Sequence, residues 1–162
     1  MPNHVQWSPE LEESFSRLKT ALCTHPVLHL PDFSKPFILQ TDASASGLGA
    51  ALLQQFSESH PRPIANWSRK LKPAKIKYAT IERELLAIVE GVRKFSIYLY
   101  GSTFILETDH MPLQYLRQYG PSCKNGRLMR WSLFLQDYSF NIHYIKGETN
   151  VLADMLSRSH AD

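Results

Sequence analysis

The sequence predicts a mixed α/β fold in which helices cover one sheet. Short apolar runs of strand length alternate along the chain with longer stretches that repeat apolar residues at helical spacing. The first three predicted strands follow one another with short connections, which implies an antiparallel meander. A long amphipathic helix then precedes a fourth strand, and such a helix is the crossover that parallel pairing with an earlier strand requires.

Length and composition indicate an ordinary globular domain. The 162 residues suffice for one domain with a real core, and 43% are hydrophobic and 20% charged. A formal charge of +3 permits a polyanionic partner without requiring one. Cys23 and Cys123 lie far apart, with no CxxC motif, which argues against a disulfide framework or zinc site.

The chain shows no signal for secretion or membrane insertion. No apolar run approaches the roughly 20 residues that cross a bilayer, and the N-terminus has no charged-then-apolar signal segment. We therefore expect an intracellular protein that is not secreted and has no membrane partner.

Residues 1–34 are predicted to form an N-terminal helix and an extended connector. Ser8 can cap the helix and Pro9 suits its first turn. Three prolines at intervals of five residues then break the chain. We expect the domain proper to span residues 35–158 and residues 159–162 to be a tail.

The stretch 37–53 predicts two adjacent strands with an acid at the bend. An apolar run reaches the lone carboxylate of Asp42, passes small residues and two glycines, and becomes apolar again. Taken alone, Asp42 beside Ser and Gly is a typical turn former. The alternative is a metal ligand on a rigid strand end. A third strand follows at 63–68, where the proline suits the first position.

The clearest element is a helix over residues 80–99, after a basic stretch at 69–77 that predicts a charged loop. Apolar residues at alternating spacings of four and three give this helix one stripe, and Gly101 stops it. The run 103–109 then repeats the earlier theme, a strand-length segment that ends in Thr-Asp.

The remainder predicts two further helices, a strand and a last helix. A short helix is expected after Pro112, and a second over 127–135. Residues 138–145 alternate as a half-exposed strand does. The last helix is expected over 149–157.

Two strands that end in Thr-Asp bring Asp42 and Asp109 to one sheet edge if the strands are parallel neighbours. A third carboxylate would come from the intervening helix. Glu90 lies nearly opposite its apolar stripe and is expected to be solvated. Glu82 and Glu84 flank the stripe on different sides; Glu84 is slightly nearer its centre, with small residues three and seven positions on that leave room for another element.

Asp154 is the fourth candidate, inside the last predicted helix. Aspartate is unfavourable in a helix interior, and apolar residues bracket this one. It is either an exposed carboxylate on the polar face or a partly buried acid that a divalent cation compensates. Clustered carboxylates would repel one another, and Mg²⁺, which prefers oxygen ligands, relieves this repulsion. No G-x-S-x-G, P-loop or H-E-x-x-H motif points to another chemistry.

Eight short segments occur in a characteristic order and spacing: Pro26-Val27-Leu28, Lys35-Pro36-Phe37, Thr41-Asp42-Ala43-Ser44, Glu82-Arg83-Glu84-Leu85-Leu86-Ala87-Ile88-Val89, Tyr98-Leu99-Tyr100-Gly101, Thr108-Asp109-His110, Arg130-Trp131 and Ala153-Asp154-Met155-Leu156-Ser157-Arg158. Together they resemble the ribonuclease H domain of gypsy-type LTR-retrotransposon reverse transcriptases, a part of the retroelement Pol polyprotein. The resemblance covers nearly the whole chain.

The resemblance implies a ribonuclease H-like fold, a five-stranded mixed sheet flanked by helices, here with an N-terminal helical appendage. It also implies an Asp-Glu-Asp-Asp metal site, in which the matching positions are Asp42, Glu84, Asp109 and Asp154. The family pattern thus selects Glu84 over Glu82. The implied cofactors are two Mg²⁺ ions, with Mn²⁺ as an alternative.

The implied activity is metal-dependent hydrolysis of the RNA strand of RNA/DNA hybrids during reverse transcription, by two-metal-ion in-line cleavage. The implied partners are the RNA/DNA hybrid and the polymerase portion of the same polyprotein, whose end would be residues 1–34. The alternative is a catalytically silent or domesticated module that binds nucleic acid or serves a structural role.

The residues that contact the substrate are predicted less directly than the metal ligands. Ser44 and Asn66 could reach sugar or phosphate, and Arg127 and Arg130 could follow a strand, although a solvated basic face is an equal interpretation. Gly47 and Gly49 are expected where the second strand passes close to the substrate. The chain departs from many cellular and retroviral ribonucleases H, because the loop before its last helix is too short for their histidine.

Overall fold

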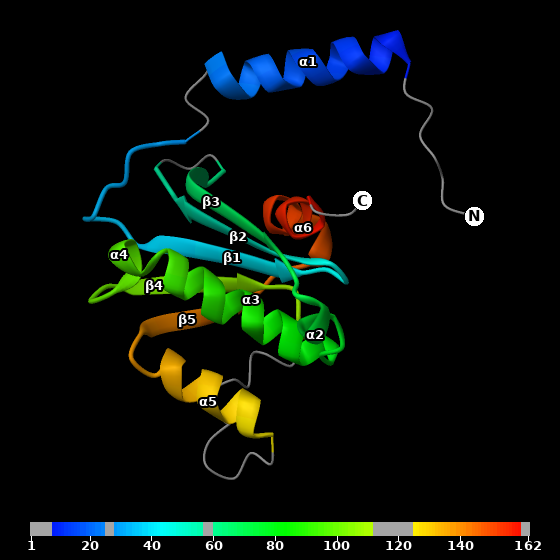
Figure 1. Cartoon of the computed structure of the whole chain (residues 1–162). Helices are drawn as coiled ribbons and strands as arrows, with labels where there is room; N and C mark the ends of the chain where they lie inside the picture. The colour runs from blue at the N-terminus through cyan, green and yellow to red at the C-terminus, as the bar shows by residue number, and fades with distance from the viewer. Residues whose placement is uncertain (1–7, 25–27, 57–59, 112–124, 160–162) are drawn as a thin grey trace.

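A computed structural model describes residues 8–24, 28–56, 60–111 and 125–159. It shows a five-stranded mixed sheet with the strand order β3-β2-β1-β4-β5 (Figure 1). The strands are β1 (Phe37–Ala43), β2 (Gly47–Gln54), β3 (Arg62–Lys70), β4 (Thr103–Thr108) and β5 (Ser139–Tyr144). The predicted mixed α/β fold is confirmed.

The pairing of the strands follows from the length of their connections. The short turns between β1, β2 and β3 make them an antiparallel meander, as predicted. β4 pairs in parallel with β1 on one side and with β5 on the other. Helix α3 (Thr80–Lys94) lies in the long connection from β3 to β4. This connection crosses one face of the sheet, so that β4 can run parallel to β1.

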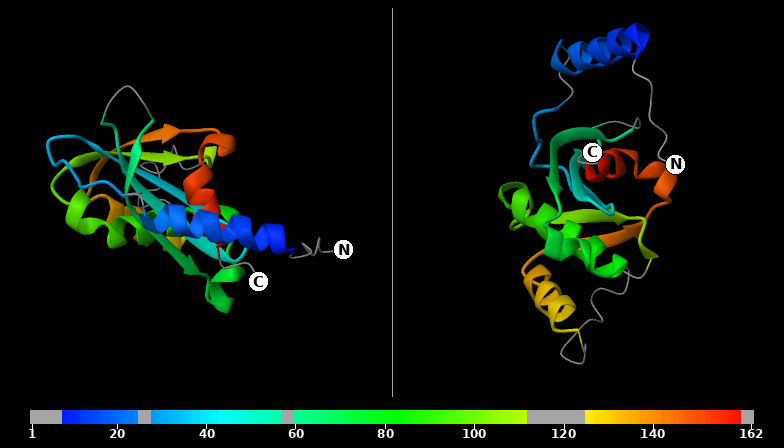
Figure 2. Two further views of the ribbon diagram at one scale, coloured as in Figure 1. Left: turned by 90° about the horizontal axis from the view of Figure 1, so that it is seen from above. Right: turned by 45° about the vertical axis from the view of Figure 1, so that its right-hand side comes forward.

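Helices lie on both faces of the sheet (Figures 1 and 2). On one face α3 packs on β1 and β2 and contacts α5 (Gly126–Leu135). On the other face α6 (Val151–Arg158) packs on β2, β1 and β3. Because both of its faces are covered, every residue of β2 is buried.

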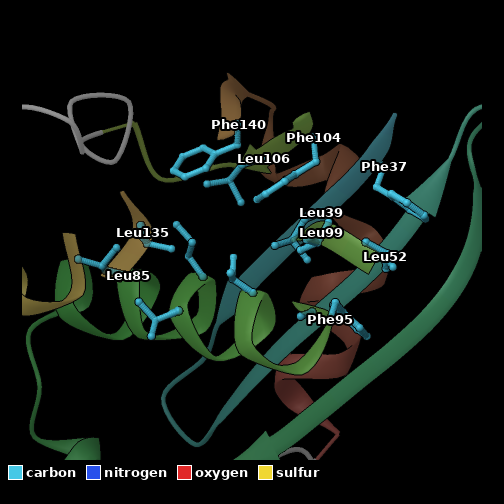
Figure 3. Close-up of a cluster of buried hydrophobic side chains, with 14 of the residues drawn as sticks. Phe37, Leu39, Leu52, Leu85, Phe95, Leu99, Phe104, Leu106, Leu135 and Phe140 are labelled. Carbon is cyan, nitrogen blue, oxygen red and sulfur yellow. The ribbon is translucent and has the colours of Figure 1, made fainter. Parts of the chain in front are cut away.

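The larger hydrophobic core lies between the sheet and α3 with α5 (Figure 3). Leu39, Leu52 and Phe104 point into it from the strands, and Leu85 from α3. A smaller cluster on the opposite face joins strand residues to α6, and its members are Ile38, Ala51 and Leu53 with Leu152 and Leu156. Alternation between two covered faces explains why β2 is nearly continuously apolar, whereas β3 and β5 carry polar, exposed residues.

Helix α1 (Pro9–Thr24) stands apart from the sheet (Figures 1 and 2). Its Leu11 and Phe15 are exposed. Among the described residues, no helix combines the length and apolar character that crossing a membrane requires.

Several predicted boundaries need correction. The helix expected over 80–99 is broken at Phe95, whose backbone leaves helical geometry while its side chain stays in the core; α4 (Ser96–Leu99) follows. Gly101, at φ 77°, ends that turn as expected. The expected loop at 69–77 is instead the end of β3 and a helical turn, α2 (Pro73–Ile76).

The last predicted helix is also interrupted. A 3₁₀ turn, η2 (Gly147–Thr149), precedes α6, which begins at Val151 because Asn150 leaves the helical region at ψ 32°. The short helix expected after Pro112 lies outside the described residues.

Candidate metal centre

Three carboxylates from three separate elements converge at one edge of the sheet. Asp42 lies on β1, Glu84 on α3 and Asp109 directly after β4. One carboxylate oxygen of each lies within 4.8 Å of those of the other two. Asp42 and Glu84 are each only 7% exposed. The structure therefore brings together three of the four predicted acids, and it places Glu84 rather than Glu82 among them.

The course of β1 and β4 explains the convergence. The two strands pair in parallel from Ile38↔Ile105 to Gln40↔Glu107, and the pairing ends there, two residues before each aspartate. The carboxyl ends of parallel strands lie at the same edge, where sites are commonly built. Both aspartates therefore lie just beyond the parallel β1–β4 pairing, although Asp42 still pairs with Gly49 of β2.

Helix α3 reaches this edge because it packs closely on the sheet. A Cβ atom on Gly91 would lie 3.1 Å from Cβ of Ala50 and 3.4 Å from Cγ2 of Thr41. The expectation that small residues beside Glu84 admit another element is thus correct. That element is the β1–β2 pair, and the contact holds Glu84 over the end of β1.

Burial and mutual repulsion disfavour the charged forms of these acids. Burial, with the charges of Asp42 and Asp109, raises the pKa of Glu84 to about 8. Burial also raises the pKa of Asp42, a hydrogen bond from Ser157 opposes this, and the charges of Asp109 and Asp154 add to it. Oδ2 of Asp42 is buried with no hydrogen-bond partner. Crowded, under-satisfied carboxylate oxygens fit a hard divalent cation.

Asp154 lies beside this group but outside it. It occupies the first turn of α6, its side chain is 41% exposed, and its Oδ1 accepts from Arg158 Nε at 2.7 Å and Nη2 at 2.6 Å. Its charge nevertheless contributes to the raised pKa of Asp42. The structure thus places the fourth predicted acid next to the site with an arginine as its partner.

Gly47 and Gly49 allow α6 to lie directly on β2. A Cβ atom at Gly47 would stand 2.3 Å from the carbonyl oxygen of Ser157, and one at Gly49 would stand 2.2 Å from that of Ala153. Among the described residues, the close neighbour of both glycines is therefore α6. The close approach that we predicted at these two glycines is present. The neighbour is the backbone of α6, whereas we expected the substrate.

Asn150 is a residue at this site that sequence reasoning missed. It is fully buried, and its Nδ2 donates to the carbonyl oxygen of Thr41, directly before Asp42. Its own carbonyl accepts from the backbone N–H of Asp154 at 3.0 Å. An Asn before a helix is a capping signal, but only the fold shows that its side chain joins α6 to β1.

Glu82 has a different role from Glu84. Its carboxylate accepts from the backbone N–H of Ala79 at 3.0 Å, from Asn125 Nδ2 at 2.9 Å and from Arg127 Nη1 at 2.7 Å. The Asn125 bond is the largest cause that lowers the pKa of Glu82. Glu82 thus joins the start of α3 to the start of α5. Glu90 is not solvated as expected: its side chain is 15% exposed and pairs with Arg69 and Lys75.

The predicted substrate residues lie on separate elements. Ser44, in the turn after β1, donates from Oγ to the carbonyl oxygen of Ser157 at 2.8 Å. Asn66 is exposed on β3, and Arg130 is exposed on α5. Arg127 binds Glu82, and its guanidinium lies 3.8 Å from the ring centroid of Tyr78. Ser44 thus contacts α6, and Arg127 joins Glu82 rather than the three acids.

Comparison with known proteins places the chain in a family. A family model described as "RNase H-like domain found in reverse transcriptase" matches residues 32–138. The chain belongs to this family. It is 43% identical over 149 residues to the "Retrovirus-related Pol polyprotein from transposon 297" of Drosophila melanogaster, covering 92% of this chain and 13% of that protein.

A second Drosophila melanogaster relative is the "Retrovirus-related Pol polyprotein from transposon gypsy", 41% identical over 158 residues, which covers 96% of this chain and 15% of that protein. The chain therefore spans about an eighth to a seventh of the polyproteins that it matches. The resemblance to a gypsy-type ribonuclease H domain is confirmed.

Solved structures of low sequence identity share the fold. A foamy viral protease-reverse transcriptase in complex with RNA/DNA hybrid matches with a TM-score of 0.63 and 19% identity, over 91% of this chain and 20% of that chain. Ribonuclease H1 of Halobacterium salinarum matches with a TM-score of 0.56 and 12% identity, over 78% of this chain and 98% of that chain. The fold is thus ribonuclease H-like, as the sequence resemblance implied.

Proposed function

We propose that this retroelement ribonuclease H domain is a cation-dependent endoribonuclease that hydrolyses the RNA strand of RNA/DNA hybrids during reverse transcription. The observation that carries the proposal is the convergence of Asp42, Glu84 and Asp109 within 4.8 Å. A foamy viral structure of the same fold contains an RNA/DNA hybrid, which supports this choice of substrate. The family and its Pol polyprotein relatives supply the context of reverse transcription.

Asp42, Glu84 and Asp109 would hold the cations, with Asp154 as the fourth ligand, and Mg²⁺ is the proposed ion with Mn²⁺ as an alternative. Two such ions supply an activated water for in-line attack on the phosphodiester and stabilise the leaving oxygen. Asp42 contributes the buried Oδ2 that no hydrogen bond satisfies.

The chain's own groups prepare this arrangement. Glu84, with its pKa raised to about 8, is mostly protonated at neutral pH before a cation binds and must release that proton to act as a ligand. Ser157, whose Oγ donates to the Asp154 carbonyl oxygen at 2.9 Å, lies beside Asp42 on the side of α6 and opposes the rise of the Asp42 pKa. Asn150 fixes the start of α6 against β1, which keeps Asp154 beside the group.

The experiment is cleavage of labelled RNA/DNA, RNA/RNA and DNA/DNA duplexes with Mg²⁺ or Mn²⁺ by the wild type and by Asp42→Asn. We expect cleavage of the hybrid alone, reduced at least about a thousandfold by Asp42→Asn. Asp137→Asn, the same change at an exposed acid after α5, is the matched control.

Two results would count against the proposal. Cleavage that survives Asp42→Asn would overturn the carboxylate mechanism. Hybrid binding without cleavage under every cation condition would favour a catalytically silent binding module.

We also propose that residues 1–34 belong to the end of a polymerase portion and that this portion contributes to hybrid binding. The separation of α1 from the sheet and its exposed Leu11 and Phe15 support the proposal. We expect the attached polymerase portion of a relative to raise hybrid affinity. Equal affinity with and without that portion would contradict it.

A further inference from the structure

Helix α6 carries a charged pair beside the carboxylate group, between Asp154 in its first turn and Arg158 in its last. Arg158 is the last residue of α6, and its Nε and Nη2 both donate to Oδ1 of Asp154, one turn earlier. Asp42 lies within the electrostatic influence of both residues, because the charge of Asp154 raises its pKa and that of Arg158 lowers it. Arg158 is therefore a positive charge held beside the proposed cation site.

The ion pair between Asp154 and Arg158 is exposed and therefore weak. The Arg158 side chain is 65% exposed and that of Asp154 is 41% exposed. Exposed ion pairs one helical turn apart are among the weakest in proteins, because water screens them and two long side chains lose freedom. Asp154 can therefore leave Arg158 at little cost, whereas Asp42 and Glu84 are buried.

The guanidinium of Arg158 would then stand unpaired beside the carboxylate group. Its planar fork of N–H donors matches two oxygens of a phosphate as well as it matches a carboxylate. The backbone of α6 is held meanwhile by other contacts, including Ser44 Oγ to the Ser157 carbonyl and Ser68 Oγ to the Leu156 carbonyl at 2.6 Å. Only the side chains need to move.

We infer that Arg158 exchanges partners during the reaction. Without a cation it neutralises Asp154; when Asp154 turns to a cation held with Asp42, Glu84 and Asp109, Arg158 is released and binds a backbone phosphate of the hybrid. This inference rests on the proposed function and deepens it, because it makes substrate binding by this arginine depend on the cation. Arg158 thereby becomes a substrate-binding residue only in the cation-loaded protein.

The first test needs no nucleic acid. The Nε–H signal of Arg158, assigned by its loss in Arg158→Gln, is followed by NMR while Mg²⁺ is added to the full chain. We expect the signal to move to the position that it already has, without cation, in Asp154→Asn. Shifts at the carboxylate group with an unmoved Arg158 signal would overturn the exchange and leave the proposed function intact, whereas no Mg²⁺-dependent shift at any residue would overturn both.

The second test measures binding of an RNA/DNA hybrid, with Ca²⁺ in place of Mg²⁺ so that binding is read while cleavage is slow. With the cation, we expect Arg158→Gln to weaken binding about tenfold and to reduce the salt slope by about 1. Without it, we expect a change below about twofold, because Asp154 already engages the arginine. Arg62→Gln, at an exposed arginine on β3, is the matched control for lost charge.

Equal weakening with and without the cation would show a permanent phosphate contact and overturn the exchange. No weakening in either condition would restrict Arg158 to neutralising Asp154 and overturn its release onto phosphate.

Discussion

Glu82 and Glu84 stand two residues apart on α3 and are buried to nearly the same degree, with 8% and 7% of their surface exposed. Their pKa values nevertheless move in opposite directions, down for Glu82 and to about 8 for Glu84. Glu82 meets donors from the α5 region and its own helix start, whereas Glu84 meets two other carboxylates. Burial is the largest cause of the raised pKa of Glu84, whereas at Glu82 the hydrogen bond from Asn125, with those from Ala79 and Arg127, outweighs burial. The partners that other segments supply therefore decide what each buried acid does.

The same difference separates a structural acid from a reactive one. A buried carboxylate that accepts several hydrogen bonds is stable as an anion and has little to gain from a cation. A buried carboxylate beside others of the same charge is stable only when protonated or bound to a cation. Substitutions at Glu82 and Glu84 test this difference directly.

The largest expected effect is on cleavage. Glu84→Gln removes a proposed cation ligand and should reduce hybrid cleavage by about 10³-fold or more, equivalent to about 4 kcal/mol of barrier. Glu82→Gln, the same change two residues away, should leave the rate within about threefold in protein that is still folded. Single-turnover cleavage at saturating Mg²⁺ measures both; equal losses in the two variants would erase the distinction.

The next effect is on the pH dependence of stability without cation. Between the ordinary pKa of 4.5 and the raised value of about 8, native Glu84 holds a proton that the unfolded chain has lost. Unfolding free energy should therefore fall as pH rises through this range, by up to about 4 kcal/mol between pH 5 and 8. Urea unfolding in EDTA measures it.

Glu84→Gln is the matched control for this pH dependence. The variant cannot titrate at position 84, so its stability profile should be flatter than that of the wild type. Identical profiles would mean that Glu84 does not bind the extra proton.

A smaller effect is expected on the stability of Glu82 variants. Glu82→Gln removes the charge that Arg127 and Asn125 engage, and it should lower the unfolding free energy at pH 7 by about 1–3 kcal/mol. Glu84→Gln should instead raise it, since glutamine is neutral without the proton that native Glu84 must take up on folding at this pH. Urea unfolding with Asp137→Asn as a neutral control tests both; a shift of the same sign would contradict the comparison.

The smallest effect concerns two arginines one turn apart on α5. Arg130 is exposed, so Arg130→Gln should weaken hybrid binding by about 1 kcal/mol or less, with a salt slope smaller by about 1, if it contacts phosphate. Arg127 is engaged by Glu82, so Arg127→Gln should mainly lower stability. Fluorescence anisotropy against salt measures the first effect and urea unfolding the second. A binding loss confined to Arg127→Gln would reverse these assignments.

Sequence patterns predicted the order and type of the main elements and the set of candidate acids. Periodicity identified the strands and the long helix. The short connections then predicted the meander, and the long helix supplied the crossover that a parallel β1–β4 pair requires. The two Thr-Asp strand ends indicated where Asp42 and Asp109 meet. The family pattern then selected Glu84 and Asp154.

Tertiary structure alone decided which partner each of these groups meets. It assigned Glu82 to Arg127, Asp154 to Arg158, Gly49 to the backbone of α6 and the amide of Asn150 to β1. The physical reason is that periodicity is a local property, whereas hydrogen bonds, repulsion and close contact depend on atoms from distant parts of the chain. For that reason a sequence can nominate a carboxylate, and only the fold determines whether it meets an arginine or another carboxylate.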